Sequence, residues 1–183
     1  MTVAGPVTKH HLALRPDHLI VVLRDIDCDA GVGGDDAITR ARQNIAASSG
    51  YGVYLEAVQN LVPIHVDVDV WDGEPEAGPS PATWAGPLLM DLDCPTGELQ
   101  VGDETGQAIS DIRPPHGPGR YRVAFYHRGR DEAPELERQV EAALAAEGDQ
   151  RVDELLAAYQ GRESYLFRLW WHGPLPEDDD DDL

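Results

Sequence analysis

Residues 62–71, VPIHVDVDVW, alternate apolar and polar side chains more strictly than any other part of the 183-residue chain. One set of alternate positions is occupied by Val62, Ile64, Val66, Val68 and Val70. The other set holds His65, Asp67, Asp69 and Trp71. Because successive side chains of a strand point to opposite faces of a sheet, this period of two predicts a strand with one buried and one solvated face. Strands of that kind are typical of antiparallel sheets.

Other short segments have a similar strand character and are separated by turns rich in Gly and Pro. We predict these further strands at residues 19–23, 51–58, 84–93, 98–101, 120–127 and 164–171. In residues 84–93, for example, Leu88, Met90 and Leu92 alternate with Asp91 and Asp93. A succession of about seven short strands with turn signals between them favours a mainly β fold, a two-layer antiparallel β-sandwich.

Two segments have helical patterns instead. The first is a short N-terminal helix that Asp35 or Asp36 caps and that continues to about Ala47. The second is an insertion of about residues 133–160 before the last strand, rich in Ala, Glu and Leu and divided by Gly148 and Asp149. We expect a helical hairpin or a broken helix there. Its predicted apolar stripes are Leu136, Val140 and Leu144, then Val152, Leu155, Leu156 and Tyr159.

The domain organisation follows from these patterns. We expect a flexible N-terminus at residues 1–16, a single β-sandwich domain at 17–172 and a disordered acidic tail at 173–183. No segment is apolar and long enough to span a membrane, and the first 14 residues lack the apolar core of a signal peptide. The two cysteines, Cys28 and Cys94, form no ligand-like cluster. These features together favour a cytoplasmic protein with reduced thiols.

The charge of the chain restricts its partners. It contains 34 Asp and Glu against 14 Lys and Arg, a formal net charge of −20, and residues 177–182 account for six of the negative charges. The folded part is therefore acidic as well. A field of this sign repels nucleic acid and anionic membranes and attracts basic molecules. We expect a basic protein partner, and neither nucleic acid nor a membrane.

Acidic side chains on the solvated faces of the predicted strands form the first candidate site. The candidate partner-binding residues are Asp67, Asp69, Asp91, Asp93 and Trp71. Like charges opposite one another destabilise a sheet, unless basic side chains compensate them or a partner uses them. Arg122 and Arg168 lie on other predicted strands and could compensate these carboxylates. An exposed Trp71 beside acidic residues suits an interface anchor.

Asp25, Asp27 and Asp29 form a second, weaker candidate, a metal site. Their spacing is similar to the start of a calcium loop, but Ala30 stands at the position that requires Gly, and Asp36 where a bidentate Glu is usual. A turn that leads into a helix explains the same residues. The alternative function is therefore a small-ligand or divalent-cation-binding module that uses these carboxylates or the strand His65–Asp69.

The sequence contains no motif of a catalytic nucleophile, nucleotide-binding loop or metalloprotease helix. No residues assemble a nucleophile with a base and an orienting group. We therefore expect a protein that is not an enzyme and has no cofactor.

The order of several segments resembles the competence protein J family. The similar segments are HLIVV at residues 18–22, the helix at 36–47, GVYLEAVQN, PIHVDV, the short strand at 97–101, PGRYRV at 118–123 and the closing YLFRLWW. The resemblance covers most of residues 17–171 except the helical insertion. The type member of that family inhibits a DNA-entry nuclease by binding it, and the family offers no catalytic residues to transfer. The resemblance implies an inhibitor or immunity-type protein that blocks a basic partner such as a nuclease or toxin.

Overall fold

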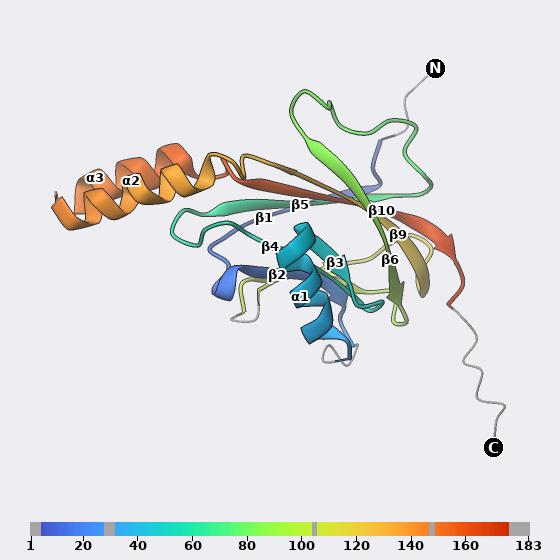
Figure 1. Ribbon diagram of the computed structural model, residues 1–183. Coiled ribbons are helices and arrows are strands. Elements are labelled where there is room, and N and C mark those ends of the chain that lie inside the picture. The colour runs from blue at the N-terminus through green and yellow to red at the C-terminus, as the bar shows by residue number, and fades with distance from the viewer. Residues whose placement is uncertain (1–4, 28–31, 104–105, 147–148, 176–183) are drawn as a thin grey trace.

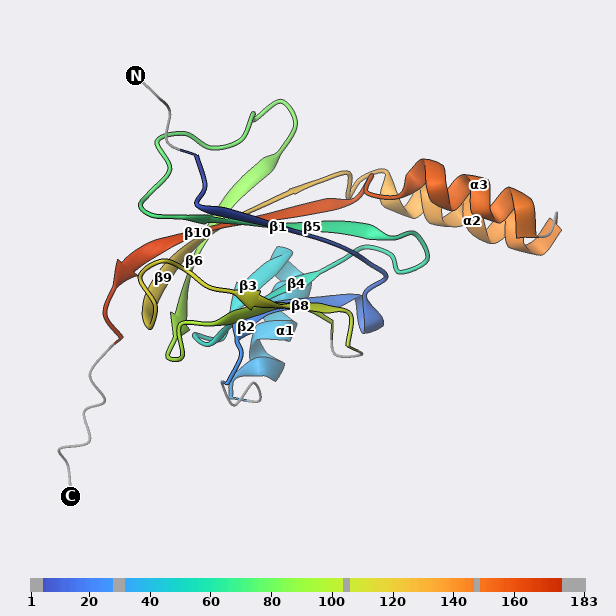
Figure 2. The ribbon, with the colours of Figure 1, turned by 180° about the vertical axis from the view of Figure 1, so that it is seen from behind.

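The computed structural model describes residues 5–27, 32–103, 106–146 and 149–175. Within them, two five-stranded sheets face each other (Figures 1 and 2). Sheet A consists, in order across the sheet, of β1 (Thr8–Leu14), β5 (Ile64–Trp71), β10 (Ser164–Gly173), β9 (Gly119–Arg128) and β6 (Ala85–Cys94). Sheet B consists of β3 (Ala46–Ser48), β4 (Gly52–Glu56), β2 (Ile20–Asp25), β7 (Leu99–Gly102) and β8 (Ala108–Ile112). The predicted mainly β, two-layer architecture is confirmed.

The main core lies between the two sheets and is formed by one side of each strand. In β5 the alternate residues Ile64, Val66, Val68 and Val70 are fully buried. They pack with aromatic side chains of the neighbouring strands, including Phe125 of β9 and Phe167 of β10. Burial of the apolar set is what the period of two in β5 predicts, since it removes these side chains from water. The opposite side is less solvated than predicted, because Asp69 is only 7% exposed and His65, Asp67 and Trp71 are half-buried.

The pairing of β5 differs in part from the expected antiparallel arrangement. β5 is antiparallel to β1 but parallel to β10, with Val68 opposite Phe167. The chain leaves β5, builds β6 to β9 and the helical hairpin, and then returns to insert β10 between β5 and β9. Sheet A is consequently mixed, whereas each pair of sheet B is antiparallel. Alternation in β5 favours an antiparallel sheet, but it reports only that one face is buried and does not identify the direction of each neighbouring strand.

Part of the N-terminal segment that was expected to be flexible, residues 1–16, is a strand. Thr8–Leu14 forms β1 along the free edge of β5, with Leu14 buried in the main core. A 3-10 turn, η1 (Asp17–Leu19), then leads into β2. Two other strands were also not predicted, β3 and β8. All three are short or lie at sheet edges, where only a few side chains are buried.

The first helix, α1 (Gly34–Asn44), packs on the outer side of sheet B (Figure 1). Its N-cap is Gly33 in a left-handed conformation, so Asp35 and Asp36 lie in the first turn rather than at the predicted capping position. There they still face the positive end of the helix dipole. The helix ends before the predicted Ala47, because the chain reverses at Ile45 and enters β3.

The insertion before the last strand is a helical hairpin that projects from one end of the sandwich (Figures 1 and 2). It consists of α2 (Ala133–Ala146) and α3 (Asp149–Tyr159). The two helices bury Val140, Ala143, Val152 and Leu155 together with Val62 of the sandwich. The predicted stripe is wrong at Leu144, which is 56% exposed, whereas the smaller Ala143 faces the partner helix.

A buried polar network connects the base of the hairpin to the sandwich. The Glu163 carboxylate, 3% exposed, accepts from the backbone amide of Val58 (2.7 Å), from Gln59 Nε2 (3.2 Å) and from the hydroxyl of Tyr165. Arg130 Nη1 donates to Tyr165 Oη (2.6 Å) and to the carbonyl of Glu56. Buried polar groups that are satisfied in this way fix geometry, so the hairpin has a defined direction relative to the sheets.

No helix among the described residues is long and apolar enough to cross a membrane. At the other end of the chain, β10 extends to Gly173, the first residue of the predicted disordered tail. Residues 176–183, which make up most of that tail, lie outside the described residues.

Candidate partner-binding face

The face of sheet A that points away from sheet B, here called the outer face, carries charged and aromatic side chains. It is built from the alternate residues of β5 that the core does not use. His65, Asp67, Asp69 and Trp71 of β5 lie on this face, and the strand register places Asp69 opposite both Lys9 of β1 and Arg168 of β10. Both carboxylates, those of Asp67 and Asp69, and Trp71 are residues that the sequence analysis selected.

Asp67 and Asp69 each have a basic neighbour within the sheet. His11 Nδ1 donates to Asp67 Oδ1 at 2.6 Å. Arg168 Nε lies 3.6 Å from Asp69 Oδ2, and both side chains are largely buried. Burial raises the pKa of the Asp69 carboxyl, and the charges of Lys9 and Arg168 oppose that shift. Asp69 therefore acts mainly within the sheet, whereas the side chain of Asp67 remains 35% exposed.

Asp91 and Asp93 belong to the opposite edge of the sheet. β6 is separated from β5 by β10 and β9, so the four predicted carboxylates form two groups rather than one patch. Arg122 Nε lies 2.8 Å from Asp91 Oδ1, and Arg120 makes a bidentate pair with Asp93 at 2.7 and 2.9 Å. The predicted compensation by Arg122 and Arg168 is thus present.

Aromatic side chains form a second cluster on the same face. Tyr126, Leu166, Trp170 and Ala124 are buried there, with Trp71 and Trp84 packed against them. The guanidinium of Arg168 lies 5.4 Å from the ring centre of Trp71, and its Nη1 donates to the carbonyl of Ala77 at 3.0 Å. Arg168 therefore connects Asp69, this aromatic cluster and the loop between β5 and β6.

The loop between β5 and β6 and the outer face enclose a cleft of about 380 Å³. Residues from four segments line it, among them Lys9, His11, Asp67, Trp84 and Arg168. Trp84 and Leu166 supply apolar walls and the charged residues supply polar groups of both signs. A volume above about 300 Å³ with few convergent polar groups is typical of binding sites. The sequence analysis missed Lys9, His11 and Trp84, because their proximity depends on β1 and on the path of the loop.

His65 lies at the end of the outer face nearest the hairpin. Its ring makes an edge-to-face contact with that of His11, with centroids 4.6 Å apart. Burial lowers the pKa of His65, as do the charges of His11 and Arg128, while Asp67 acts in the opposite direction. The described residues contain no group of three or more His, Cys, Asp or Glu side chains arranged to hold a metal ion.

In the part of the candidate metal loop that the structure describes, Asp25 has a structural role. Asp25 is fully buried and accepts hydrogen bonds from the backbone amide of Asp27 (3.0 Å) and from the amide and hydroxyl of Thr96 (2.9 and 2.8 Å). Its carboxylate thus holds the β2 end against the turn before β7. Asp29 lies outside the described residues. Cys94 is buried beside Asp25, and burial raises the pKa of its thiol.

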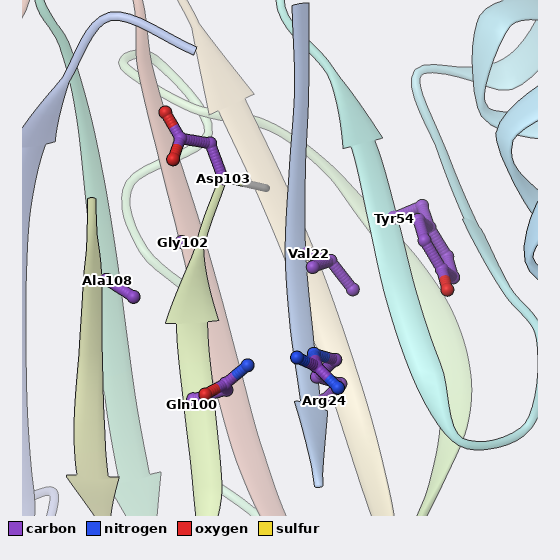
Figure 3. A pocket seen from close by; sticks show the side chains of 7 residues that line it. All are labelled: Val22, Arg24, Tyr54, Gln100, Gly102, Asp103 and Ala108. Atoms are coloured by element: carbon purple, nitrogen blue, oxygen red, sulfur yellow. The ribbon is translucent and has the colours of Figure 1, made fainter. Parts of the chain in front are cut away.

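Sheet B has a smaller hollow on its outer side, next to α1 (Figure 3). Arg24 and Gln100 lie at one end and Asp103 at the other, with Val22 between them. With the amide of Gln100 oriented to accept, Arg24 donates to it through Nη2 (2.6 Å) and Nε (2.8 Å). The hollow measures about 100 Å³, which is small for an organic ligand.

Two facing sheets with charged and aromatic side chains on one outer face define this chain as a two-layer β-sandwich protein. No protein-family model and no curated protein matches it. Among solved structures it is similar to "Crocagin biosynthetic gene J", with 19% identity, a TM-score of 0.53 and coverage of 92% of this chain and 99% of that chain. It is also similar to ComJ from Bacillus subtilis, described as an inhibitor of the DNA degrading activity of NucA. That comparison has 10% identity, a TM-score of 0.53, and coverage of 91% and 97%. The resemblance to the competence protein J family is confirmed for the fold.

Proposed function

We propose that this protein is a non-enzymatic inhibitor or immunity-type protein that binds and blocks a basic protein partner, such as a nuclease or toxin. The observation that carries the proposal is the shared fold with ComJ over 91% of the chain. The net charge of −20 supports a basic partner, because it accelerates the approach of positively charged molecules and repels nucleic acid itself.

The outer face of sheet A is the proposed contact surface. Asp67 and Asp91 are the more accessible of the four candidate carboxylates, with side chains 35% and 46% exposed. Asp69 and Asp93 are about 10% exposed and paired with arginines, so they hold the surface in shape rather than contact the partner strongly. Trp71 lies at the end of β5, on the same strand as Asp67, and its contacts with the aromatic cluster supply apolar area of the kind that an interface centre requires.

The test is a capture experiment followed by an activity measurement. The full chain is used as bait in lysate of its source cell at low and at high salt, and captured basic proteins are identified. Each is then assayed for DNA degradation or toxicity with and without the bait. We expect a partner that is retained at low salt, is released at high salt because screening weakens the charge interactions, and loses activity when bound.

Two variants test whether the contact lies on the outer face. Asp67→Asn and Trp71→Ala should weaken binding of the captured partner, Trp71→Ala by roughly tenfold or more. Asp111→Asn is the matched control, since it removes the same charge from β8 of sheet B, where the Asp111 side chain is 82% exposed. Equal weakening by the control and by Asp67→Asn would remove the outer face from the proposal. Failure to recover any inhibited partner would count against the function itself.

A small-ligand-binding module is the second candidate function. The cleft of about 380 Å³ beside Asp67 favours it, because this cleft includes part of the strand that the sequence analysis selected for such a role. Thermal unfolding in the presence of a panel of metabolites and divalent cations tests it. Saturable stabilisation that Lys9→Gln abolishes would support a ligand in this cleft, because Lys9 lines it.

A further inference from the structure

A second cleft lies at the base of the hairpin and differs in charge from the rest of the molecule. It has a volume of about 260 Å³ and lies between the start of β6 and the end of β9. Thr83 and Trp84 line one side, and the backbone and side chains of residues 127–131 line the other. The second side contains His127, Arg128 and Arg130, and one acidic residue, Asp131.

Arg128 and Arg130 lack carboxylate partners in the part of the chain that the structure describes. Neither has a carboxylate oxygen within 4.0 Å, whereas Arg120, Arg122 and Arg168 of the same sheet each do. The chain has more than two acidic residues for each basic one. Two arginines against one carboxylate, that of Asp131, therefore give the lining of this cleft a positive excess in an acidic protein.

The side chain of Arg128 is held in place by an aromatic ring. Its guanidinium carbon lies 4.7 Å from the centre of the Trp84 ring. The face of the planar guanidinium rests on the ring, which fixes its orientation. The N–H groups at the edge of the guanidinium remain able to form a bidentate contact with a ligand. Stacking also reduces the conformational freedom that binding would otherwise remove.

Arg130 supplies a fixed charge in the wall of the cleft. Its Nη1 is engaged by Tyr165 Oη and the carbonyl of Glu56, so the side chain has a defined position. Neither partner is itself charged, and the Glu163 carboxylate, to which Tyr165 donates, offsets part of the charge of Arg130 from the far side of the tyrosine. Burial lowers the pKa of the adjacent His127, and Arg130 lowers it further, against an opposing contribution from Asp131. The positive end of the 14-residue helix α2, which begins at Ala133, lies next to the same residues.

We propose that this cleft binds the oxyanion group of a small molecule, a phosphate or a carboxylate, with Arg128 as the main ligand. Arg130 contributes long-range attraction, and the hydroxyl of Thr83 is a neutral donor on the opposite wall. The net charge of −20 selects for a small anion over nucleic acid, because a polyanion meets the repulsion of the whole molecule.

Isothermal titration with two probes tests the site. Inorganic phosphate and succinate are titrated separately into the full chain at constant ionic strength, and the imidazole signals of His127 are followed by NMR. We expect one saturable site for at least one probe, with shifts at His127. Binding of phosphate alone identifies a phosphate site, and binding of succinate alone identifies a carboxylate site.

The variant Arg128→Gln should reduce the affinity at least tenfold, and Arg128→Lys should recover part of it, because Lys keeps the charge but not the planar fork. Arg138→Gln is the matched control, since it removes an arginine from the exposed surface of α2, where the side chain is 69% exposed. It should change the affinity less than twofold. Circular dichroism establishes that each variant is folded. Absence of saturable binding by both probes, or equal affinity in Arg128→Gln and the wild type, would overturn the proposal.

Discussion

His65 shows how one side chain on the outer face connects strand, neighbour and hairpin. It lies on β5 opposite Ala13 and Ser164, and its ring contacts His11. A Cβ atom placed on Gly161, at the end of the hairpin, would come within 2.3 Å of the same ring. The imidazole therefore fills a crowded space on that side, and burial is the main cause of its lowered pKa.

This lowered pKa predicts a loss of stability in mild acid. The unfolded chain binds a proton at the ordinary pKa of 6.5, whereas folded His65 binds it only at lower pH. The free energy of unfolding should therefore fall as the pH decreases from about 6.5. Replacing His65 by Gln should make this fall smaller between about pH 7.5 and about pH 5, as measured by urea denaturation at each pH.

The control for His65→Gln is His18→Gln, which replaces a histidine whose side chain is 84% exposed. It should leave the pH dependence close to that of the wild type. An unchanged slope in His65→Gln, or a steeper one, would contradict the expected effect of burial. Part of the slope should persist in the variant, because burial also lowers the pKa of His127.

Single residues also show which parts of the candidate site the sequence could predict. Because their strands were recognised, Asp67 and Trp71 could be assigned to the solvated face of β5 from alternation alone. The distance between Asp69 and Asp91 could not be predicted in this way. It depends on the insertion of β10 and β9 between their strands, which is a property of topology. The role of Arg128 was missed for the same reason, since Trp84 reaches it from a distant segment.

At the level of elements, the strands that are buried along most of one side were recognised. β5 and β10 have several large apolar residues at core positions. β1, with the sequence TKHHLAL, buries only its last residue fully and lies at an edge, so its pattern is weak. β3 has three residues and directly follows α1, where helical and strand signals overlap. Short edge strands therefore limited the prediction of this fold more than the core did.

The connection of the hairpin to the sandwich depends on two glycines with positive φ, Gly129 and Gly161. Gly129 has φ +74°, and a Cβ atom there would lie 1.9 Å from the carbonyl oxygen of Arg162. Both the conformation and the space thus exclude a side chain. Gly129 and Arg162 approach each other closely here, and this keeps the end of β9 beside the start of β10 at the base of the hairpin.

Gly129→Ala should consequently destabilise the protein strongly. Gly117→Ala is an unusually close control, because Gly117 has φ +69° but a Cβ atom added there would meet no heavy atom within 4 Å. Both variants incur the cost of a left-handed alanine, about 1–2 kcal/mol, and only Gly129→Ala adds a steric overlap of about 1–3 kcal/mol. Urea denaturation should show the free energy of unfolding lower in Gly129→Ala by about 2 kcal/mol than in Gly117→Ala. Equal values would mean that the hairpin connection relaxes freely.

At the level of the whole molecule, the negative charge is unevenly distributed. Residues 131–160 contain nine Asp and Glu and two Arg, a net charge of −7 on 30 residues. The tail at residues 177–182 contributes −6. The remaining residues therefore carry only −7, and on the outer face of sheet A arginines offset several of these carboxylates. The hairpin and the tail therefore contribute most of the long-range electrostatic field, whereas the charged side chains of the sandwich act mainly through short-range pairs.

This distribution predicts how salt changes stability. Paired charges such as Arg120 and Asp93 are close together and partly buried, so salt screens them little. Repulsion among the unpaired carboxylates acts over about 10 Å or more and is screened effectively at about 0.1 M salt. The free energy of unfolding at neutral pH should therefore rise when sodium chloride is increased from about 10 mM to about 150 mM.

Charge-neutralising variants of the hairpin separate repulsion from other effects of salt. Glu132→Gln combined with Glu141→Gln removes two exposed charges from the N-terminal helix of the hairpin and its approach. The salt-induced increase in the free energy of unfolding should become smaller in this double variant. Glu98→Gln is the comparison, because the Glu98 side chain pairs with Arg113 at 3.2 Å and its removal eliminates an attraction. A decrease of stability with salt in the wild type would show that attraction between ion pairs, rather than repulsion, dominates the electrostatics of the folded chain.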